Sequence, residues 1–447
     1  MKALLRYVLG INRSMLVALS FALLIGLGTL LLMLPWANTN GQWRPVLDAL
    51  FTATSASCVT GLAVLDTGRD LTLFGQLVLI VLIQIGGLGI MTITSLLSMG
   101  LGKRINIRQR LLIQESLNQD EPGGVLHITK NIVRYTLLME AAFGTLLAVY
   151  FYKDMGAKAF YWGYWHAVSA FCNAGFDLMG HFASFVSLRD DIAVNLCFIV
   201  LITVGGIGFT VIEDVLAKRC WRKFTLHTKI VLSVNGLLLL GGTLLIWLLE
   251  RGNNATVGEL SAGQQLLAAL FQSVSLRTAG FNTIDIASVG QGTLFIMMAL
   301  MFIGASSTST GGGIKTTTFA VLMASTFALL RGKKDVVLFR RRLDSAVINK
   351  STSVFVLAVL WVATATFLLL VLDDKGQPLR FVLFEVFSAM GTVGMGVGIT
   401  PQWNGWCKLV LILTMFIGRI GILTFSMSFF NKKTDRLRYP TENILIG

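Results

Sequence analysis

Long apolar stretches alternate with shorter amphipathic ones along this chain, in the same order four times. A helix needs about 20 apolar residues to cross a bilayer, whereas one of 12–14 residues rises only about 20 Å. The leading long stretches are 16–36, 133–152, 228–249 and 353–372; the short ones are 45–57, 159–171, 263–276 and 379–390; the closing long ones are 73–101, 192–216, 293–330 and 406–430. The pattern predicts an all-α integral membrane protein with eight spans and four re-entrant helices.

A glycine turn ends each short stretch. The turns read Ser-Ala-Ser-Cys-Val-Thr-Gly (55–61), Ser-Ala-Phe-Cys-Asn-Ala-Gly (169–175), Val-Ser-Leu-Arg-Thr-Ala-Gly (274–280) and Ser-Ala-Met-Gly-Thr-Val-Gly (388–394). Their last glycines lie 114, 105 and 114 residues apart, and such a period indicates a repeated structural unit. The predicted units are repeat 1 (1–102), repeat 2 (103–217), repeat 3 (218–331) and repeat 4 (332–431), followed by a cytoplasmic tail (432–447). Each is a membrane–pore-loop–membrane unit, and the four surround a pseudo-fourfold pore.

Composition and charge support a membrane location and set the orientation. Of the 447 residues 54% are hydrophobic and 13% charged, against about 25% charged in soluble proteins. The net charge of +14 comes largely from Lys and Arg in five segments, which are 1–14, 101–134, 217–229, 331–350 and 432–438. Because basic segments remain in the cytoplasm, this distribution reflects topology rather than nucleic-acid binding and puts both termini there. The first apolar run is too long for a signal-peptide core and is expected to be retained.

The four turns suggest a cation site. Irregular backbone at membrane depth is tolerated only where protein buries it or where it lines water. Four turns on one axis would direct the negative ends of the short helices at a cation, and glycine permits carbonyls to replace its water shell. The alternative is that the glycines only allow close helix packing. The predicted potassium filter comprises Val59, Thr60, Gly61, Asn173, Ala174, Gly175, Thr278, Ala279, Gly280, Thr392, Val393 and Gly394, with the threonine hydroxyls and the asparagine amide ordering the turns.

A second glycine series lies in the closing stretches. In repeats 1, 2 and 4 it reads Gly-Gly-Leu-Gly (86–89), Gly-Gly-Ile-Gly (205–208) and Gly-Arg-Ile-Gly (418–421), where we expect close packing or a kink. Repeat 3 instead has Gly-Ala-Ser-Ser-Thr-Ser-Thr-Gly-Gly-Gly-Ile-Lys-Thr-Thr-Thr (304–318). Three successive glycines cost about 1 kcal/mol each in a helix, so this segment is expected to unwind beneath the turns and to act as a gate.

Arg419 places a charge within an apolar stretch. Ionisable residues inside a membrane usually face a cavity or a partner and serve function. Its five donors are expected to hold loop carbonyls near residues 311–313, and its charge to oppose cations. The alternative is an arginine that reaches to the membrane surface. The predicted gate residues are Gly304, Gly311, Gly312, Gly313, Lys315, Thr316 and Arg419.

Together these features resemble the Trk/Ktr/HKT superfamily of potassium transporters over the whole chain. The four filter glycines, Gly-Gly-Gly-Ile-Lys-Thr-Thr-Thr at 311–318 and Gly-Arg-Ile-Gly at 418–421 carry the resemblance. The start at the first repeat and the tail 439–447 are similar to the membrane subunits of bacterial Ktr systems. The resemblance implies multi-pass insertion in the bacterial cytoplasmic membrane and uptake of K+, with stimulation by Na+. Some sodium-preferring plant relatives have serine where this chain has Gly61, which favours potassium.

The resemblance also implies a homodimer on a cytosolic KtrA-type RCK ring that binds ATP or ADP, with no organic cofactor in this chain. The residues leave other classes to consider. A sodium- or proton-coupled secondary transporter of another solute would use buried acids, and Glu140 is the main acid within a span. A membrane enzyme would need convergent His, Asp or Cys groups, and the cysteines and histidines also lack metal-ligand spacing. The basic segment 331–350 could be a juxtamembrane helix, a lipid contact, a docking face or a solvated charge run.

Overall fold

The computed structural model describes residues 13–90, 92–93 and 125–429 and is mostly helical. Four long helices lead the repeats: α2 (Arg13–Met33), α7 (Val125–Met155), α11 (Leu226–Glu250) and α15 (Ser345–Leu372). Each is long and apolar enough to cross a bilayer. The expectations for the N-terminal basic residues, most of segment 101–134 and the tail 432–447 fall outside the described residues.

The four short helices are present within one residue of their expected bounds. They are α3 (Val46–Ser57), α8 (Lys158–Phe171), α12 (Ala262–Ser275) and α16 (Leu379–Gly391). Each packs against the leading helix of its own repeat, so that α2 pairs with α3, α7 with α8, α11 with α12 and α15 with α16. A capping box fixes the start of α12, because Ser261 and Gln264 satisfy each other's backbone amides.

The closing stretches are broken more sharply than expected. Helices α9 (Ile192–Ile207) and α10 (Phe209–Lys218) meet at 96°, and α17 (Gly405–Ile420) and α18 (Ile422–Phe429) meet at 99°. The bends occur at Gly208 and Gly421, whose φ angles of +104° and +92° favour glycine. In repeat 1, α4 (Leu73–Leu88) ends at another left-handed glycine, Gly89. Four described helices can cross a bilayer, or six if each bent pair is one span, so eight spans stays a prediction.

In repeat 3 the closing stretch unwinds, as its glycines indicate. Helix α13 (Gln291–Phe302) and helix α14 (Thr316–Leu330) are separated by residues 303–315, named here the repeat 3 loop. The expected unwinding to residue 318 is wrong at its end, because Thr316, Thr317 and Thr318 form the first turn of α14. Lys315 precedes this turn with extended backbone, which ends the loop.

Helix packing between repeats is cyclic. The closing helix of each repeat packs on the short helix of the next, in the order α4 on α8, α9 on α12, α13 on α16 and α17 on α3. An ion pair of 2.9 Å between Lys408 of α17 and Asp48 of α3 joins the last pair. The second glycine series also packs closely, because a Cβ on Gly86, Gly205 or Gly418 would strike the end of a short helix. The four turns therefore face one another.

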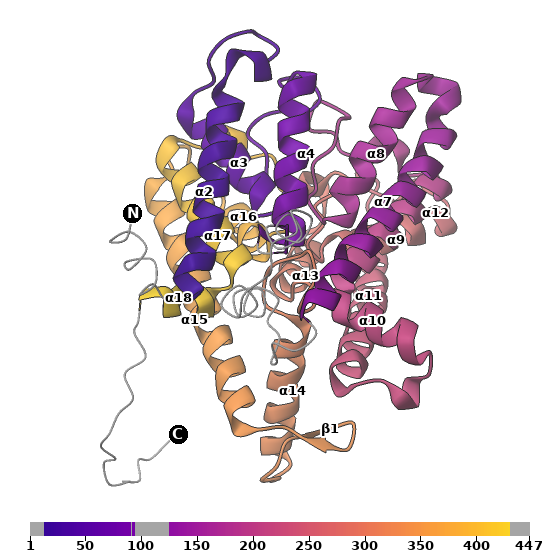
Figure 1. Ribbon diagram of the computed structural model, residues 1–447, viewed down its shortest axis with the longest axis vertical. Coiled ribbons are helices and arrows are strands. Elements are labelled where there is room, and N and C mark those ends of the chain that lie inside the picture. Colours follow the sequence, from indigo (N-terminus) through magenta and orange to yellow (C-terminus); the bar gives the residue numbers. More distant parts are fainter. Residues whose placement is uncertain (1–12, 91, 94–124, 430–447) are drawn as a thin grey trace.

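Helices α14 and α15 extend beyond the other helices at one end of the molecule (Figure 1). A hairpin of β1 (Val337–Leu338) and β2 (Arg341–Arg342) joins them within the basic segment, and helix begins only at Ser345. An exposed 3.0 Å ion pair between Arg342 and Asp335 closes the hairpin. Short 3-10 helices in other connections are η1 (Pro35–Ala37), η2 (Val186–Leu188), η3 (Trp221–Lys223), η4 (Ile286–Ser288) and η5 (Thr400–Gln402).

All five cysteines lie in or beside apolar stretches, which predicts that they are buried, and Cys58, Cys172 and Cys407 are. The expectation is wrong for Cys220, which is exposed, and only partly right for half-buried Cys197. Cys220 lies in the basic connection between α10 and α11, where no apolar packing covers it.

Candidate cation site

The four turn glycines form a closed ring. Each faces the carbonyl oxygen that precedes the next turn glycine; the pairs are Gly61 with Ala174, Gly175 with Ala279, Gly280 with Val393 and Gly394 with Thr60. A Cβ added to Gly61 or Gly175 would lie only 2.5 or 2.7 Å from the facing oxygen. The other two glycines leave still less room. A side chain at any of the four positions would therefore collide with the neighbouring turn.

Backbone conformation repeats around the ring. The turn glycines have φ angles from +68° to +95°, and the residues two positions earlier are also left-handed. These are Val59 (+57°), Asn173 (+59°), Thr278 (+78°) and Thr392 (+49°). Left-handed non-glycine residues are uncommon, so four at equivalent positions indicate a built feature. The residue between each pair does not have positive φ, so the backbone alternates in the same way in all four turns.

Serines at the start of three turn motifs fix the turns. The hydroxyls of Ser55 and Ser388 each accept a hydrogen bond of 3.1 Å from the turn glycine amide six residues later. The hydroxyl of Ser169 donates to the carbonyl of Phe176 at 2.7 Å. These serines were not predicted to hold the turns, although each lies six residues before its turn glycine in the sequence.

The polar side chains of the predicted filter residues behave differently from one another. The Asn173 amide and the Thr278 hydroxyl lie 3.3 Å apart and connect the second and third turns. The Thr392 hydroxyl instead accepts a 3.0 Å hydrogen bond from the amide of Gly312 in the repeat 3 loop. The Thr60 hydroxyl is buried and has no partner among the described residues. The expectation that all of them order the turns is therefore wrong for Thr60 and Thr392.

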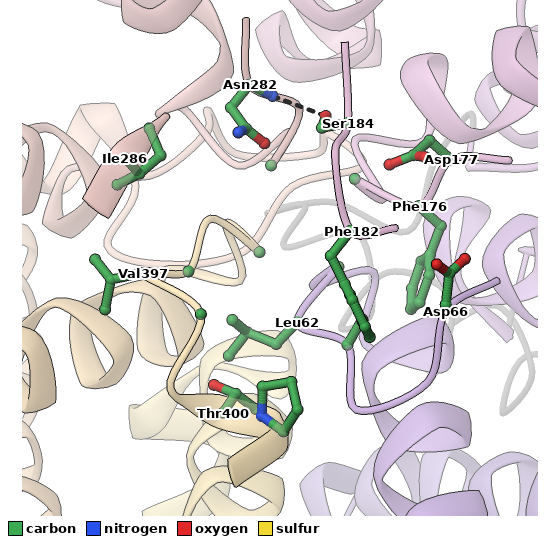
Figure 2. A pocket seen from close by; sticks show the side chains of 18 of the residues that line it. Leu62, Asp66, Phe176, Asp177, Phe182, Ser184, Asn282, Ile286, Val397 and Thr400 are labelled. Atoms are coloured by element: carbon green, nitrogen blue, oxygen red, sulfur yellow. Dashed lines mark hydrogen bonds between the residues drawn. The ribbon is translucent and has the colours of Figure 1, made fainter. Parts of the chain in front are cut away.

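A cavity of about 270 Å³ opens over the ring and is lined by all four turn glycines. One acid from each repeat also lines it: Asp66, Asp177, Asp285 and Glu385. In Figure 2 Asp66 and Asp177 lie close to each other, across the cavity from Ile286 and Val397. None of these four acids was predicted to belong to the site. The available signal was their position, since each aspartate follows its turn glycine by two or five residues.

These acids hold the outer loops as well as supplying charge. Glu385 is fully buried, and its carboxylate accepts hydrogen bonds from the Val397 amide (3.1 Å) and the Thr400 hydroxyl (2.9 Å). Asp177, in an outer loop, accepts one from the Met179 amide at 2.8 Å. Burial, with a smaller effect from the charge of Asp66, raises the pKa of Asp177 to about 6 although the Met179 amide lowers it. Asp177 therefore gains or loses its charge near neutral pH.

The repeat 3 loop lies against the left-handed residues of the ring. A Cβ on Gly311 would strike the Thr278 hydroxyl, and one on Gly312 would strike that of Thr392. Gly304 faces the Gly312 carbonyl, which also accepts a 3.3 Å hydrogen bond from the Ala305 amide. The glycines of the loop are thus required for its close approach to the ring.

Backbone hydrogen bonds pin the other side of the loop to the break in repeat 2. The amides of Thr310 and Ser306 donate to the carbonyls of Gly205 (3.2 Å) and Gly206 (3.1 Å). In the reverse direction the Phe209 amide donates to the Thr308 carbonyl at 3.0 Å. The right-angled bend between α9 and α10 therefore exposes backbone groups that the loop satisfies.

Arg419 connects the loop to repeat 1. Its guanidinium donates to the carbonyl of Thr310 and to those of Gly86 and Gly87, the last at 3.1 Å. It lies next to the last residue of α17, at the bend, rather than in mid-helix. The carbonyls of residues 311 and 312 are instead held by Lys315, at 2.8 and 3.5 Å. Thr316, the first residue of α14, pairs its hydroxyl with that of Ser306 at 3.0 Å.

Residues 11–437 match the TrkH family, described as a cation transport protein. Ktr system potassium uptake protein B of Bacillus subtilis is 43% identical over 96% of each chain, and that of Vibrio alginolyticus is 42% identical over 96% of this chain and 94% of its own. Potassium/sodium uptake protein NtpJ of Enterococcus hirae is 38% identical, covering 97% and 96%. The crystal structure of the potassium transporter TrkH from Vibrio parahaemolyticus has the same fold, with a TM-score of 0.72 at 22% identity over 93% of this chain and 84% of that one.

Proposed function

The chain belongs to the TrkH family of cation transport proteins, and on that premise we propose that it takes up potassium across the bacterial cytoplasmic membrane. The observation that carries the proposal is the closed ring, in which each turn glycine leaves room only for the next turn's carbonyl. Backbone oxygens in such a ring replace the water shell of a bare cation. The printed names of the similar Ktr proteins supply the ion, potassium.

In this proposal the twelve predicted filter residues of the four turns select the ion. The acids of the cavity raise the local cation concentration, because negative charge in a low-dielectric cleft focuses the field. The short helices point their negative C-terminal ends at the ring, which offsets the loss of water. Cations then pass between carbonyls of four quasi-equivalent turns on one pseudo-fourfold axis.

We further propose that the repeat 3 loop is the gate. It lies directly against the ring, where its backbone obstructs the path. Lys315 and Arg419 place two positive charges beside it, and their bonds to loop carbonyls hold it in place. Opening requires these bonds to be exchanged, so the loop can be released without altering the ring.

The remaining elements of the proposal concern assembly. Repeats 1 to 4 have the predicted bounds, eight spans insert with both termini in the cytoplasm, and the chain forms a homodimer. A KtrA-type RCK ring that binds ATP or ADP regulates the gate, and Na+ stimulates uptake. Two observations support the partner subunit and the stimulation by sodium: the similar proteins are named as parts of a Ktr system, and NtpJ is named for both potassium and sodium.

The test is potassium uptake by a transport-deficient bacterium that expresses this chain with and without a KtrA-type subunit. We expect rescue of growth at low potassium only with both. Purified chain together with the KtrA-type subunit in liposomes should carry K+ in the presence of a protonophore, because the ion runs down its own gradient. Flux that requires a proton or sodium gradient, or transport of a different solute, would instead support a coupled secondary transporter. Glu140, the acid that such a mechanism would use, does not line the cavity.

A further inference from the structure

Glu140 is a buried acid in the middle of α7, with only 5% of its surface exposed. Its Oε2 accepts a hydrogen bond of 3.2 Å from the side-chain amide of Gln84 in α4. Its Oε1 has no hydrogen-bond partner among the described residues. An ionised carboxylate with one amide donor is expensive in such surroundings, whereas a neutral carboxylic acid keeps the same hydrogen bond at lower cost.

The other end of Gln84 reaches the second filter turn. Its Oε1 accepts a hydrogen bond from the thiol of Cys172 at 3.4 Å, which is within the range for sulfur. Cys172 is fully buried and directly precedes Asn173, the left-handed residue of that turn. A carboxyl, an amide and a thiol therefore form one chain from α7 to the backbone of the ring.

The same turn of α4 also touches the predicted gate. A Cβ on Gly87 would lie 2.8 Å from the Cys172 sulfur, so the helix and the filter turn are in direct contact. The carbonyls of Gly86 and Gly87 receive Arg419, which also holds Thr310 of the repeat 3 loop. Residues 84–87 thus contact both the ring and Arg419, which holds the repeat 3 loop. Within this segment Gln84 is the residue that hydrogen-bonds to Glu140.

We propose that Glu140, in its neutral form, is a positioning residue for ion selection, acting through Gln84 and Cys172 on the second filter turn. This inference rests on the proposed function. Glu140 does not line the cavity and so does not bind the ion. It determines where Gln84 places its oxygen, and hence how far the Cys172 turn can move against α4.

The experiment measures apparent potassium affinity and potassium-over-sodium preference of uptake in Glu140→Leu, Glu140→Gln and Cys172→Ala. Loss of one buried hydrogen bond corresponds to a change of about 3- to 10-fold. We expect Glu140→Leu and Cys172→Ala each to weaken potassium affinity by about that factor, and the double variant to be no worse than either. Glu140→Gln keeps an acceptor oxygen for Gln84 and should restore most of the loss.

Tyr161→Phe is the matched control. Tyr161 of α8 donates a 2.8 Å hydrogen bond to Gln76 of α4, in the same interface and half-buried, but no hydrogen bond of this pair reaches a filter turn. Removal of the Tyr161–Gln76 hydrogen bond should leave the potassium affinity and the potassium-over-sodium preference unchanged. An equal effect of Tyr161→Phe would show general loosening of the interface and overturn the inference.

The remaining outcomes separate this inference from the proposed function. Unchanged selectivity in both Glu140→Leu and Cys172→Ala overturns the inference alone, as does a Glu140→Gln variant as impaired as Glu140→Leu, which would show that the charge is needed. If Glu140→Leu does not reach the membrane, Cys172→Ala, which removes only the last hydrogen bond, decides. Wild-type protein that carries no potassium would overturn both proposals.

Discussion

The ring of turns and the repeat 3 loop are both irregular backbone in the interior of a membrane protein, but they are held differently. Four equivalent turns build the ring, and each is fixed by a serine hydrogen bond within its own repeat, the third by Ser275. One repeat supplies the loop, and side chains and backbone of repeats 1, 2 and 4 hold it through Arg419, Gly205 and Thr392.

On the proposed function, this difference separates two tasks, ion selection by the ring and opening by the loop. A selective site needs fixed geometry, which contacts along each turn provide. A movable barrier needs contacts that can be exchanged together, and bonds to other repeats meet that need because a small shift between repeats breaks several at once. The variants below should affect either selection or opening, and their order follows the expected size of the effect.

The largest effect is expected from the ring glycines. Gly61→Ser, Gly175→Ser, Gly280→Ser or Gly394→Ser forces a side chain into a left-handed residue and against a facing carbonyl. Strain of about 1–3 kcal/mol at such a residue corresponds to a loss of roughly 5- to 150-fold in potassium-over-sodium preference. Uptake kinetics over a potassium series, with sodium as competitor, measure it.

Gly376→Ser is the control for strain alone. Gly376 also has positive φ, +67°, but nothing lies within 4 Å of an added Cβ. It should retain wild-type preference. If all four ring variants reach the membrane and keep their affinity, the ring does not select the ion.

The next effect concerns the loop. Deleting residues 311–313 removes the part that contacts Thr278 and Thr392, so potassium flux should rise several-fold and depend less on a cytosolic partner. The preference for potassium should change little, because the turns keep their own hydrogen bonds. Flux assays in liposomes test both points. Low flux from a well-inserted deletion variant would make the loop a structural segment instead.

A smaller increase in potassium flux is expected when the contacts of Arg419 with the repeat 3 loop are weakened. Arg419→Gln removes the charge and most donors to Thr310, Gly86 and Gly87, and hydrogen bonds from charged groups contribute about 1.5–3 kcal/mol each. Resting flux should rise about 3- to 10-fold. Arg419→Lys should restore the electrostatic barrier but not the three-point contact, since lysine is a point charge. Abolished flux in an inserted Arg419→Gln variant would indicate an anchor for the fold.

The smallest effect on uptake should come from the charge of Asp177 in the cavity. Because the pKa of Asp177 is about 6, its carboxyl is charged above that pH and neutral below it. Apparent potassium affinity should fall about two- to threefold as external pH drops from 7 to 5, because one charge of the cavity is lost. Asp177→Asn should show the lower affinity at both pH values. If Asp177→Asn keeps the full pH response of potassium affinity, another group causes that response.

Much of the fold followed from local patterns. The short helices were predictable to one residue because their amphipathic length and terminal glycine are both local signals. The loop in repeat 3 was predictable because successive glycines and threonines cannot sustain an apolar helix. Kinks at Gly208 and Gly421 were also expected, but their right angle was not predictable, since a glycine in the sequence only permits a bend. What enforces the first of them is the loop, which bonds to the exposed backbone from about 100 residues away.

Which residues of the candidate cation site bond to one another was harder to predict than which residues belong to it. Arg419 was expected to bind loop carbonyls near residues 311–313 and does bind the adjacent carbonyl of Thr310, but its bonds to repeat 1 and those of Lys315 to residues 311 and 312 were not predicted. The choice depends on side-chain reach across repeats, which spacing along the chain does not contain. The same holds for Glu385, which lies before its turn glycine while the aspartates follow theirs.

Because one chain supplies all four turns of the ring, a single codon change alters only one turn. The positions three residues before the turn glycines have already diverged and are Cys58, Cys172, Arg277 and Gly391. In an assembly of four identical subunits the same mutation would strike every turn at once and would more often be lethal. In a single chain each turn can instead vary separately, so the surroundings of the ring differ while the four glycines are alike.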